Sequence, residues 1–114
     1  MILVTGSSGY VGSELIPRLK PKTQLYGVDI ISSEHTDILA GIETAEFKIK
    51  LEQLVFDEVN VVNLAAARFD FGAAACDYFY LNVRCHELFL ESLNNTNVKN
   101  FVHVSSVASL DGRD

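Results

Sequence analysis

Several features that mark particular kinds of protein are scarce or missing in this sequence. Basic residues are few and scattered: 9 Lys and Arg stand against 15 Asp and Glu, which gives a net charge of −6. Proteins that bind nucleic acid or an anionic membrane usually carry a cluster of positive charge. We therefore expect neither nucleic acid nor a membrane as a partner.

Long apolar runs are missing as well. The chain opens with Met-Ile-Leu-Val and reaches Thr5 and Gly6 at once, with no basic segment before the apolar residues. Such a start is too short for a signal peptide or a membrane span. The expected location is the cytoplasm.

Cysteine is rare. Cys76 and Cys85 fall in one predicted helix, where a rotation of about 100° per residue turns them to opposite faces. They cannot form a disulfide with each other, and two reduced cysteines agree with a cytoplasmic location. His35 and His86 have no cysteine or carboxylate at the spacing of a metal site, so we expect no metal.

The sequence does contain enough apolar residues for a folded core. Hydrophobic residues make up 48% of the 114 residues and charged residues 21%, which is typical of a folded soluble chain. The length suits one domain but is short for an enzyme with both a cofactor-binding and a substrate-binding half. We expect a single domain over residues 1–114.

Short apolar runs alternate with helical spacing along the chain. Strands are predicted over residues 2–5, 24–31, 46–51, 60–66 and 100–105, and helices over residues 13–19 and 76–93. Residues 32–45 are predicted to be loop with at most a short helix, and Pro17 to kink the first helix or end it early. His103 in the last strand is predicted to be a hydrogen-bonded core residue and not a catalytic one.

The predicted strands are apolar almost throughout, which is typical of a parallel sheet covered on both faces. Right-handed crossovers then favour a doubly wound α/β fold with strand order 3-2-1-4-5. The sequence stops just after the fifth strand, so we expect the fold to be truncated there.

Three glycines follow the first predicted strand at three-residue intervals, in VTGSSGYVGSEL. A glycine turn between a strand and a helix presents backbone N–H groups and the positive end of the helix dipole to an anion. Gly6 is expected to permit the tight turn, Gly9 to let the backbone approach phosphates, and Gly12 to let the helix pack closely on the strand. The pattern predicts a pyrophosphate site.

Two other glycine motifs do not fit this segment. A P-loop requires Gly-Lys-Ser or Gly-Lys-Thr at its end, but Gly12 is followed by Ser13 and Glu14. A hydrolase nucleophile elbow would need glycine where Tyr10 stands.

Asp29 lies at the end of the second predicted strand, twenty residues after Gly9. A carboxylate at this place in a dinucleotide site accepts a hydrogen bond from a ribose hydroxyl. It would also repel a 2′-phosphate, and neither Ser7, Ser8 nor the isoleucines after Asp29 offer a basic side chain to bind one. The expected cofactor is NAD and not NADP.

Four segments carry a further signal: TGSSGYVG (5–12), NLAAA (63–67), YLNVRCHELFLESL (80–93) and FVHVSS (101–106). Together, in this order and spacing, they resemble the extended short-chain dehydrogenase/reductases, the NAD-dependent epimerase/dehydratase proteins. The resemblance implies a Rossmann fold and NAD as cofactor. It also implies hydride transfer, by an epimerase, dehydratase or dehydrogenase, on a nucleotide-sugar or similar hydroxyl or carbonyl substrate.

The resemblance also assigns residues to the cofactor site. In the family the small residues after the fourth strand lie against the cofactor, and an asparagine on the long helix, here Asn82, helps to organise the site. The expected cofactor-binding residues are Thr5, Gly6, Ser8, Gly9, Tyr10, Val11, Gly12, Asp29, Ile30, Leu64, Ala65, Ala66, Ala67, Asn82 and Val104.

For catalysis the resemblance implies a Ser or Thr at the end of the fifth strand that hydrogen-bonds the substrate oxygen, and a later Tyr-x-x-x-Lys that moves the proton. Alignment of the strand places Ser106 at the first position, with Ser105 as the alternative; alignment from Gly112 would place Val107 there. No Tyr-x-x-x-Lys occurs in the sequence. We therefore expect the cofactor-binding part of a longer enzyme, inactive alone.

A second function stays open beside the enzyme. A module that binds a nicotinamide dinucleotide without turnover, as a sensor or scaffold, would carry the same glycine turn and the same acid. Related enzymes often dimerise through the long helix, so a homodimer is expected by resemblance.

Overall fold

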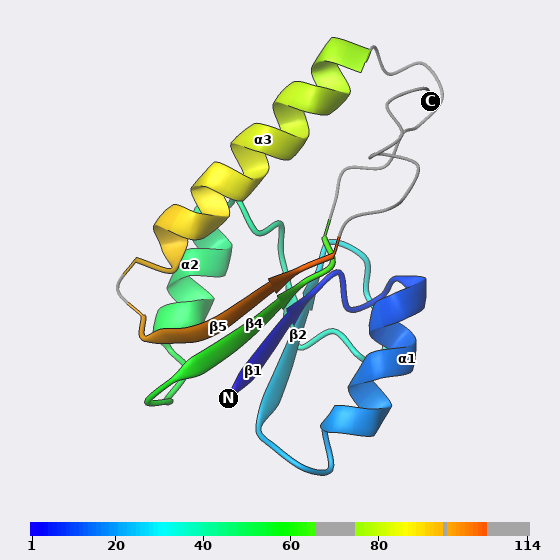
Figure 1. Cartoon of the computed structure of the whole chain (residues 1–114), viewed down its shortest axis with the longest axis vertical. Helices are drawn as coiled ribbons and strands as arrows, with labels where there is room; N and C mark the ends of the chain where they lie inside the picture. The colour runs from blue at the N-terminus through cyan, green and yellow to red at the C-terminus, as the bar shows by residue number, and fades with distance from the viewer. Residues whose placement is uncertain (66–74, 95, 105–114) are drawn as a thin grey trace.

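The computed structural model describes residues 1–65, 75–94 and 96–104, with residues 75–82 described by their backbone alone. Its elements are β1 (Ile2–Thr5), α1 (Tyr10–Leu19), β2 (Leu25–Asp29), β3 (Ile38–Leu39), α2 (Ala45–Glu52), β4 (Val59–Asn63), α3 (Ala75–Ser92) and β5 (Val98–His103) (Figure 1). In this part of the chain, no helix combines the length and the apolar character that a membrane crossing requires.

The strands form one parallel sheet in the order β3-β2-β1-β4-β5. This order confirms the predicted doubly wound α/β fold. The carboxyl ends of parallel strands lie at one edge of the sheet, and in open α/β sheets this is the edge at which ligands bind. The turn after β1 and the segment after β2 both leave the sheet there.

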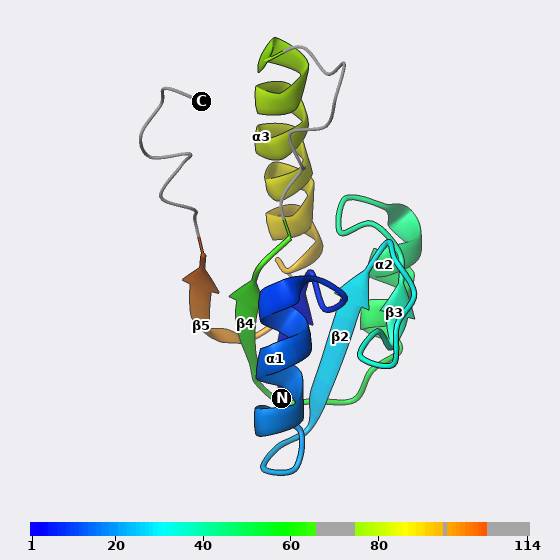
Figure 2. The ribbon, with the colours of Figure 1, turned by 90° about the vertical axis from the view of Figure 1, so that its right-hand side faces the viewer.

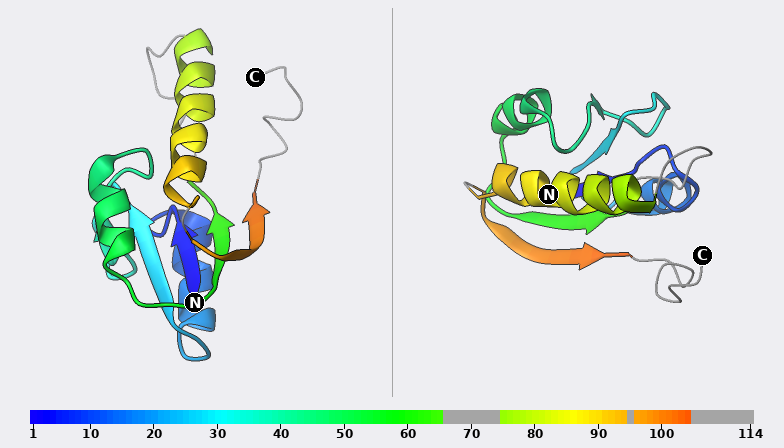
Figure 3. Two further views of the ribbon diagram at one scale, coloured as in Figure 1. Left: turned by 90° about the vertical axis from the view of Figure 1, so that its left-hand side faces the viewer. Right: turned by 90° about the horizontal axis from the view of Figure 1, so that it is seen from above.

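Helices cover both faces of the sheet. Figure 2 shows α1 in front of the sheet, and the left view of Figure 3, from the opposite side, shows α2 and α3 in front. Val4 packs with Ile16 of α1, whereas its neighbour Leu3 packs in the core that holds Phe47 and Phe89. Successive residues of β1 thus contribute to two separate cores, which fix the sheet from both sides.

The third strand is not where the sequence predicts it. Residues 46–51 lie in helix α2, and β3 is the two-residue strand Ile38–Leu39 inside the predicted loop. Thr44 caps the helix by accepting a hydrogen bond from the Phe47 N–H at 3.2 Å. Phe47 and Leu51, four residues apart, are both buried. The buried residues therefore follow a helical period.

Helix α1 continues past Pro17 and ends at Leu19. Of the two outcomes expected at Pro17, the early end of the helix is therefore wrong, and the kink stays a prediction. Beyond the proline, the Lys20 N–H still donates to the Ile16 carbonyl at 2.9 Å, so the last turn closes. The helix begins at Tyr10, three residues before the predicted start, and so follows the glycine turn directly.

Candidate functional site

The turn between β1 and α1 is held tightly at Gly6. Its φ is +73°, in the left-handed region that favours glycine, and its N–H donates to the Val28 carbonyl of β2 at 2.8 Å. A Cβ on Gly6 would lie 2.9 Å from the Leu64 carbonyl carbon and 3.0 Å from the Ala65 nitrogen. The tight turn expected at Gly6 is confirmed, and it lies against the end of β4.

Gly12 lets the first turn of α1 pack against the same loop. A Cβ at this position would lie 2.5 Å from the Gly6 oxygen and 3.0 Å from the Ser7 Cα. Both contacts are with backbone, which cannot move aside cheaply. The close approach expected at Gly12 is present, and its immediate partner is the glycine turn that follows the strand.

Gly9 is different, because the protein itself restricts a side chain there less than at Gly6 or Gly12. Its φ of −76° and ψ of 175° are ordinary extended angles. Within the described ranges, the one atom that a Cβ would meet within 4 Å is the Gly6 oxygen, at 3.3 Å. The backbone at Gly9 therefore has an uncovered face, which suits a ligand that approaches the main chain closely.

The N-terminus of α1 offers an anion backbone donors at this uncovered face. Gly9 is the N-cap, makes no side-chain capping bond, and has no acidic residue in the turn after it. The Ser13 N–H makes the first intrahelical bond, to the Gly9 oxygen at 2.9 Å. The N–H groups of Tyr10, Val11 and Gly12 precede it and lie at the positive end of the helix dipole. A pyrophosphate fits such a donor set.

Asp29 ends β2 beside this turn. Its Oδ2 accepts the Ser8 N–H at 2.9 Å and its Oδ1 accepts the Ile31 N–H at 3.0 Å. Both carboxylate oxygens are therefore fixed in place by backbone donors. Because a carboxylate oxygen can accept two hydrogen bonds, each can still accept one from a sugar hydroxyl.

Apolar side chains flank the turn and Asp29. Tyr10 is 85% exposed and Val11 51% exposed on the first turn of α1, and Ile30, directly after Asp29, is 73% exposed. Exposed apolar residues at the rim of a polar site provide a surface on which the flat rings of a ligand can pack.

Thr5 joins β1 to β4 at the same edge of the sheet. It is fully buried, and its Oγ1 accepts the N–H groups of Leu64 and Ala65 at 3.2 and 3.1 Å. Its proton is donated to Asn63 Oδ1 at 2.5 Å. Thr5 thereby holds Leu64 and Ala65 against the glycine turn, and its own contact with a cofactor stays a prediction.

Asn63 and two histidines extend this network, and sequence reasoning missed them as a group. Asn63 Nδ2 lies 3.1 Å from His103 Nδ1 on β5, and His86 Nε2 on α3 lies 3.1 Å from the Ala65 oxygen. The two imidazole rings meet edge to face, with centroids 5.3 Å apart. His103 is hydrogen-bonded as predicted, but it is exposed, so the predicted place in the core is wrong. The one signal in the sequence is Asn63 itself, the polar residue that directly follows an apolar run and opens NLAAA.

The remaining predicted residues are only partly placed. Val104 follows β5, is exposed, and donates its N–H to the Asn63 oxygen at 3.2 Å. Asn82 lies on α3, where the backbone alone is described. Ala66, Ala67, Ser105, Ser106 and Val107 lie outside the described residues. The catalytic role of Ser106 stays a prediction.

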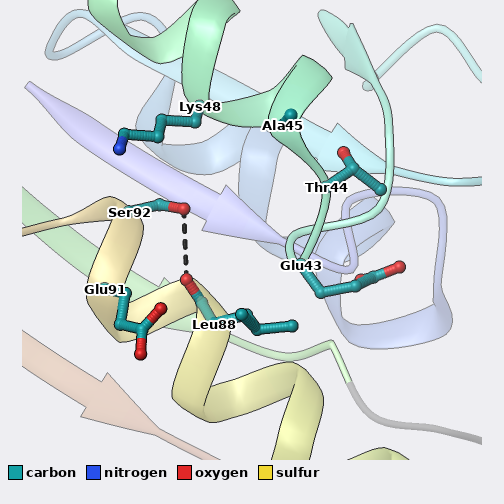
Figure 4. Close-up of a pocket in the computed structure, with 7 residues that line it drawn as sticks. All are labelled: Glu43, Thr44, Ala45, Lys48, Leu88, Glu91 and Ser92. Carbon is teal, nitrogen blue, oxygen red and sulfur yellow. Dashed lines mark hydrogen bonds between the residues drawn. The ribbon is translucent and has the colours of Figure 1, made fainter.

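A pocket of about 150 Å³ lies elsewhere, between α2 and α3. Figure 4 shows its lining residues: Glu43, Thr44, Ala45, Lys48, Leu88, Glu91 and Ser92. None of them is a predicted site residue. Beside it, burial raises the pKa of the Cys85 thiol, and the Glu43 carboxylate raises it further, so this cysteine is a weak nucleophile near neutral pH. Across the described ranges, no three His, Cys, Asp or Glu side chains form a group that could hold a metal ion.

Known proteins resemble this chain in sequence and in fold. The model of the NAD dependent epimerase/dehydratase family matches residues 2–112. A short-chain dehydrogenase/reductase superfamily protein from Agrobacterium tumefaciens, solved with bound NAD, is 25% identical with a TM-score of 0.72; the match covers 93% of this chain and 32% of that one. ADP-L-glycero-D-manno-heptose-6-epimerase from Helicobacter pylori is 24% identical with a TM-score of 0.71, over 93% of this chain and 39% of that one.

A third similar structure is UDP-glucose-4-epimerase from Stenotrophomonas maltophila with bound NAD and formylated UDP-arabinopyranose. It is 24% identical with a TM-score of 0.71, over 94% of this chain and 37% of that one. The chain thus spans between 32% and 39% of the length of these three proteins. No curated protein sequence matches it. Because the family match covers nearly the whole chain, the chain belongs to the NAD dependent epimerase/dehydratase family.

Proposed function

We propose that residues 1–114 form a single NAD-binding domain, the cofactor-binding part of an epimerase, dehydratase or dehydrogenase. The observation that carries the proposal is the uncovered backbone of Gly9 at the N-terminus of α1, next to an Asp29 carboxylate already held by two N–H groups. An anion at the helix and a hydroxyl at the carboxylate are the two groups that an adenosine diphosphate presents together.

The donor set favours NAD over NADP. The N–H groups of Tyr10 and Val11 would hold the pyrophosphate, and Asp29 would hold the adenosine ribose. A 2′-phosphate on that ribose would face the negative charge of Asp29. Bound NAD would supply the hydride acceptor and donor at its nicotinamide ring.

The nicotinamide end would lie toward the ends of β4 and β5. Leu64, Ala65, Ala66 and Ala67 would border the cofactor there, with Asn82 helping to organise the site. Ser106, or Ser105 in the alternative alignment, would orient the reacting oxygen of the substrate. The proton would be moved by a Tyr-x-x-x-Lys that this sequence lacks, so we expect no turnover by these residues alone.

The substrate we infer is a nucleotide-sugar or a similar hydroxyl or carbonyl compound. Two of the similar structures support this substrate class by their names: ADP-L-glycero-D-manno-heptose-6-epimerase and UDP-glucose-4-epimerase are both epimerases of nucleotide-sugars. A non-catalytic dinucleotide-binding module is the alternative, favoured by the missing Tyr-x-x-x-Lys. The intact mass of the protein, measured after isolation from its own cell, distinguishes the enzyme from the binding module. A mass well above the 12.6 kDa of this chain, with a Tyr-x-x-x-Lys in the additional sequence, supports the enzyme.

Calorimetric titration with NAD and NADP tests the proposed cofactor. We expect NAD to bind more tightly than NADP, and Asp29→Ala to weaken NAD binding by about tenfold, the effect of losing one charge-assisted hydrogen bond. The control is Asp57→Ala, at an exposed position between α2 and β4. Equal binding of NAD and NADP by the unmodified chain, or unchanged NAD binding after Asp29→Ala, would contradict the proposal.

A further inference from the structure

The loop between β2 and β3 folds back across β2 and rests on the glycine turn. It can do so because residue 27 is glycine: a Cβ there would run into the His35 carbonyl oxygen and would lie 2.7 Å from the Ser7 Cβ. Asp37 fixes the far end of the loop, because its N–H donates to the Gly27 oxygen and its Oδ2 accepts the Gly27 N–H, both at 2.8 Å. The loop is thus pinned to the strand it crosses.

Four hydroxyl groups join this loop to the glycine turn, and we refer to Ser7, Ser8, Ser33 and Thr36 as the hydroxyl cluster. Thr36 Oγ1 lies 2.7 Å from both Ser7 Oγ and Ser8 Oγ, and 3.3 Å from Ser33 Oγ. Ser8 Oγ also donates to the Ile31 oxygen at 2.6 Å. Thr36 is therefore the residue of the loop whose side chain meets both serines of the turn.

The cluster joins the two segments whose backbone N–H groups orient Asp29. One oxygen of Asp29 accepts the N–H of Ser8, which belongs to the turn, and the other accepts the N–H of Ile31, which belongs to the loop. The carboxylate keeps both bonds only while loop and turn keep their relative position. Since Ser8 belongs to the hydroxyl cluster and its Oγ donates to the Ile31 carbonyl, the cluster helps to fix the distance between these two donors.

We propose that Thr36 is a positioning residue for dinucleotide recognition, which acts by holding the β2–β3 loop on the glycine turn and so fixing Asp29 for a ribose hydroxyl. This inference rests on the proposed NAD-binding function. It assigns Thr36 no contact with the ligand: its hydroxyl is engaged with the hydroxyls of Ser7 and Ser8, each 2.7 Å away. Without that hydroxyl, the bonds from Ser8 to the loop remain, but the loop is held less firmly on the turn, and the N–H groups of Ser8 and Ile31 are held less firmly on Asp29.

The test compares Thr36→Val, which keeps the shape and removes the hydroxyl, with Thr36→Ser, which keeps the hydroxyl. Thr23→Val is the matched control, at an exposed position between α1 and β2. Two quantities are measured: amide hydrogen exchange of Ser8 and Ile31 in the ligand-free chain, and the Kd for NAD by calorimetry. We expect Thr36→Val to lower the protection of both amides and to weaken NAD binding, each by about tenfold. Thr36→Ser and Thr23→Val should stay within about twofold of the unmodified chain.

Three results would overturn the inference. Unchanged amide protection and NAD affinity in Thr36→Val would show that the hydroxyl positions nothing. An equal loss in Thr36→Ser would show that the residue serves packing. Lower amide protection with normal NAD affinity would remove the role in ribose recognition. By contrast, an unmodified chain that binds no NAD would contradict the proposed function itself. The amide exchange of Ser8 and Ile31 would then still show whether Thr36 holds Asp29 in place.

Discussion

Asn63 and His103 are register partners on β4 and β5, and the Asn63 side-chain nitrogen lies 3.1 Å from His103 Nδ1. The direction of this hydrogen bond follows from Thr5. Its hydroxyl accepts two backbone N–H groups, so its own proton is donated to Asn63 Oδ1. The amide nitrogen of Asn63 therefore faces His103, and since an amide nitrogen only donates, Nδ1 is the acceptor. Neutral His103 is held with its proton on Nε2.

We predict that Asn63→Asp moves this proton. A carboxylate oxygen in place of the amide nitrogen can only accept, so His103 must carry a proton on Nδ1 to keep the bond. Nitrogen-15 NMR of the imidazole distinguishes the two states. The control is Asn60→Asp on the same strand, where the oxygen already accepts the Asn100 amide at 2.9 Å. An unchanged His103 spectrum in Asn63→Asp would contradict the assignment.

We predict that Gly12→Ala destabilises the fold by about 1–3 kcal/mol, the usual cost of forcing a methyl group into a packed site. The new Cβ would lie 2.5 Å from the Gly6 oxygen, so α1 must move away from the turn. The free energy of unfolding in urea measures the effect. Gly9→Ala is the matched control in the same turn, and an equal loss in both variants would contradict the different roles assigned to the two glycines.

Glu43 should control the reactivity of Cys85. Burial raises the pKa of the thiol, and the Glu43 carboxylate raises it further because it disfavours a second negative charge nearby. Glu43→Gln removes that charge, so the pKa should fall and the thiolate fraction at a given pH should rise. In a Cys76→Ser background, alkylation by iodoacetamide should become faster and its pH midpoint lower. The control is Glu46→Gln, at an exposed position on α2. Faster alkylation of Cys85 in Glu46→Gln but not in Glu43→Gln would refute the role assigned to the Glu43 charge.

The strand order could be predicted from the sequence, but the third strand could not. In EFKIKL the apolar residues Phe47, Ile49 and Leu51 alternate as in a strand, yet Ile49 is 55% exposed while the other two are buried. The cap at Thr44 lies outside the alternating segment and favours the helix. The real β3 has two residues, too few for any periodic pattern.

The candidate site divides in the same way. The glycine turn and Asp29 are recognisable in the sequence because each feature is local, and their spacing follows from one strand-turn-helix-strand unit. Asn63 and His103, forty residues apart, meet only when β4 pairs with β5. Thr36 reaches Ser7 only because the loop crosses β2 at Gly27. Such contacts depend on tertiary packing, and no pattern in the sequence indicates them.

The most direct test of the account is the NAD affinity of the unmodified chain and of Gly9→Ala, measured by calorimetry beside the free energy of unfolding. A methyl group on the uncovered face of Gly9 would occupy the place that we propose for the phosphates, and within the described residues its one near contact is the Gly6 oxygen, at 3.3 Å. We predict NAD binding by the unmodified chain, and a loss of at least about tenfold in Gly9→Ala, with a change in unfolding free energy below about 1 kcal/mol. Equal affinity in the two chains, or no NAD binding by either, would contradict the central claim that this backbone holds a dinucleotide.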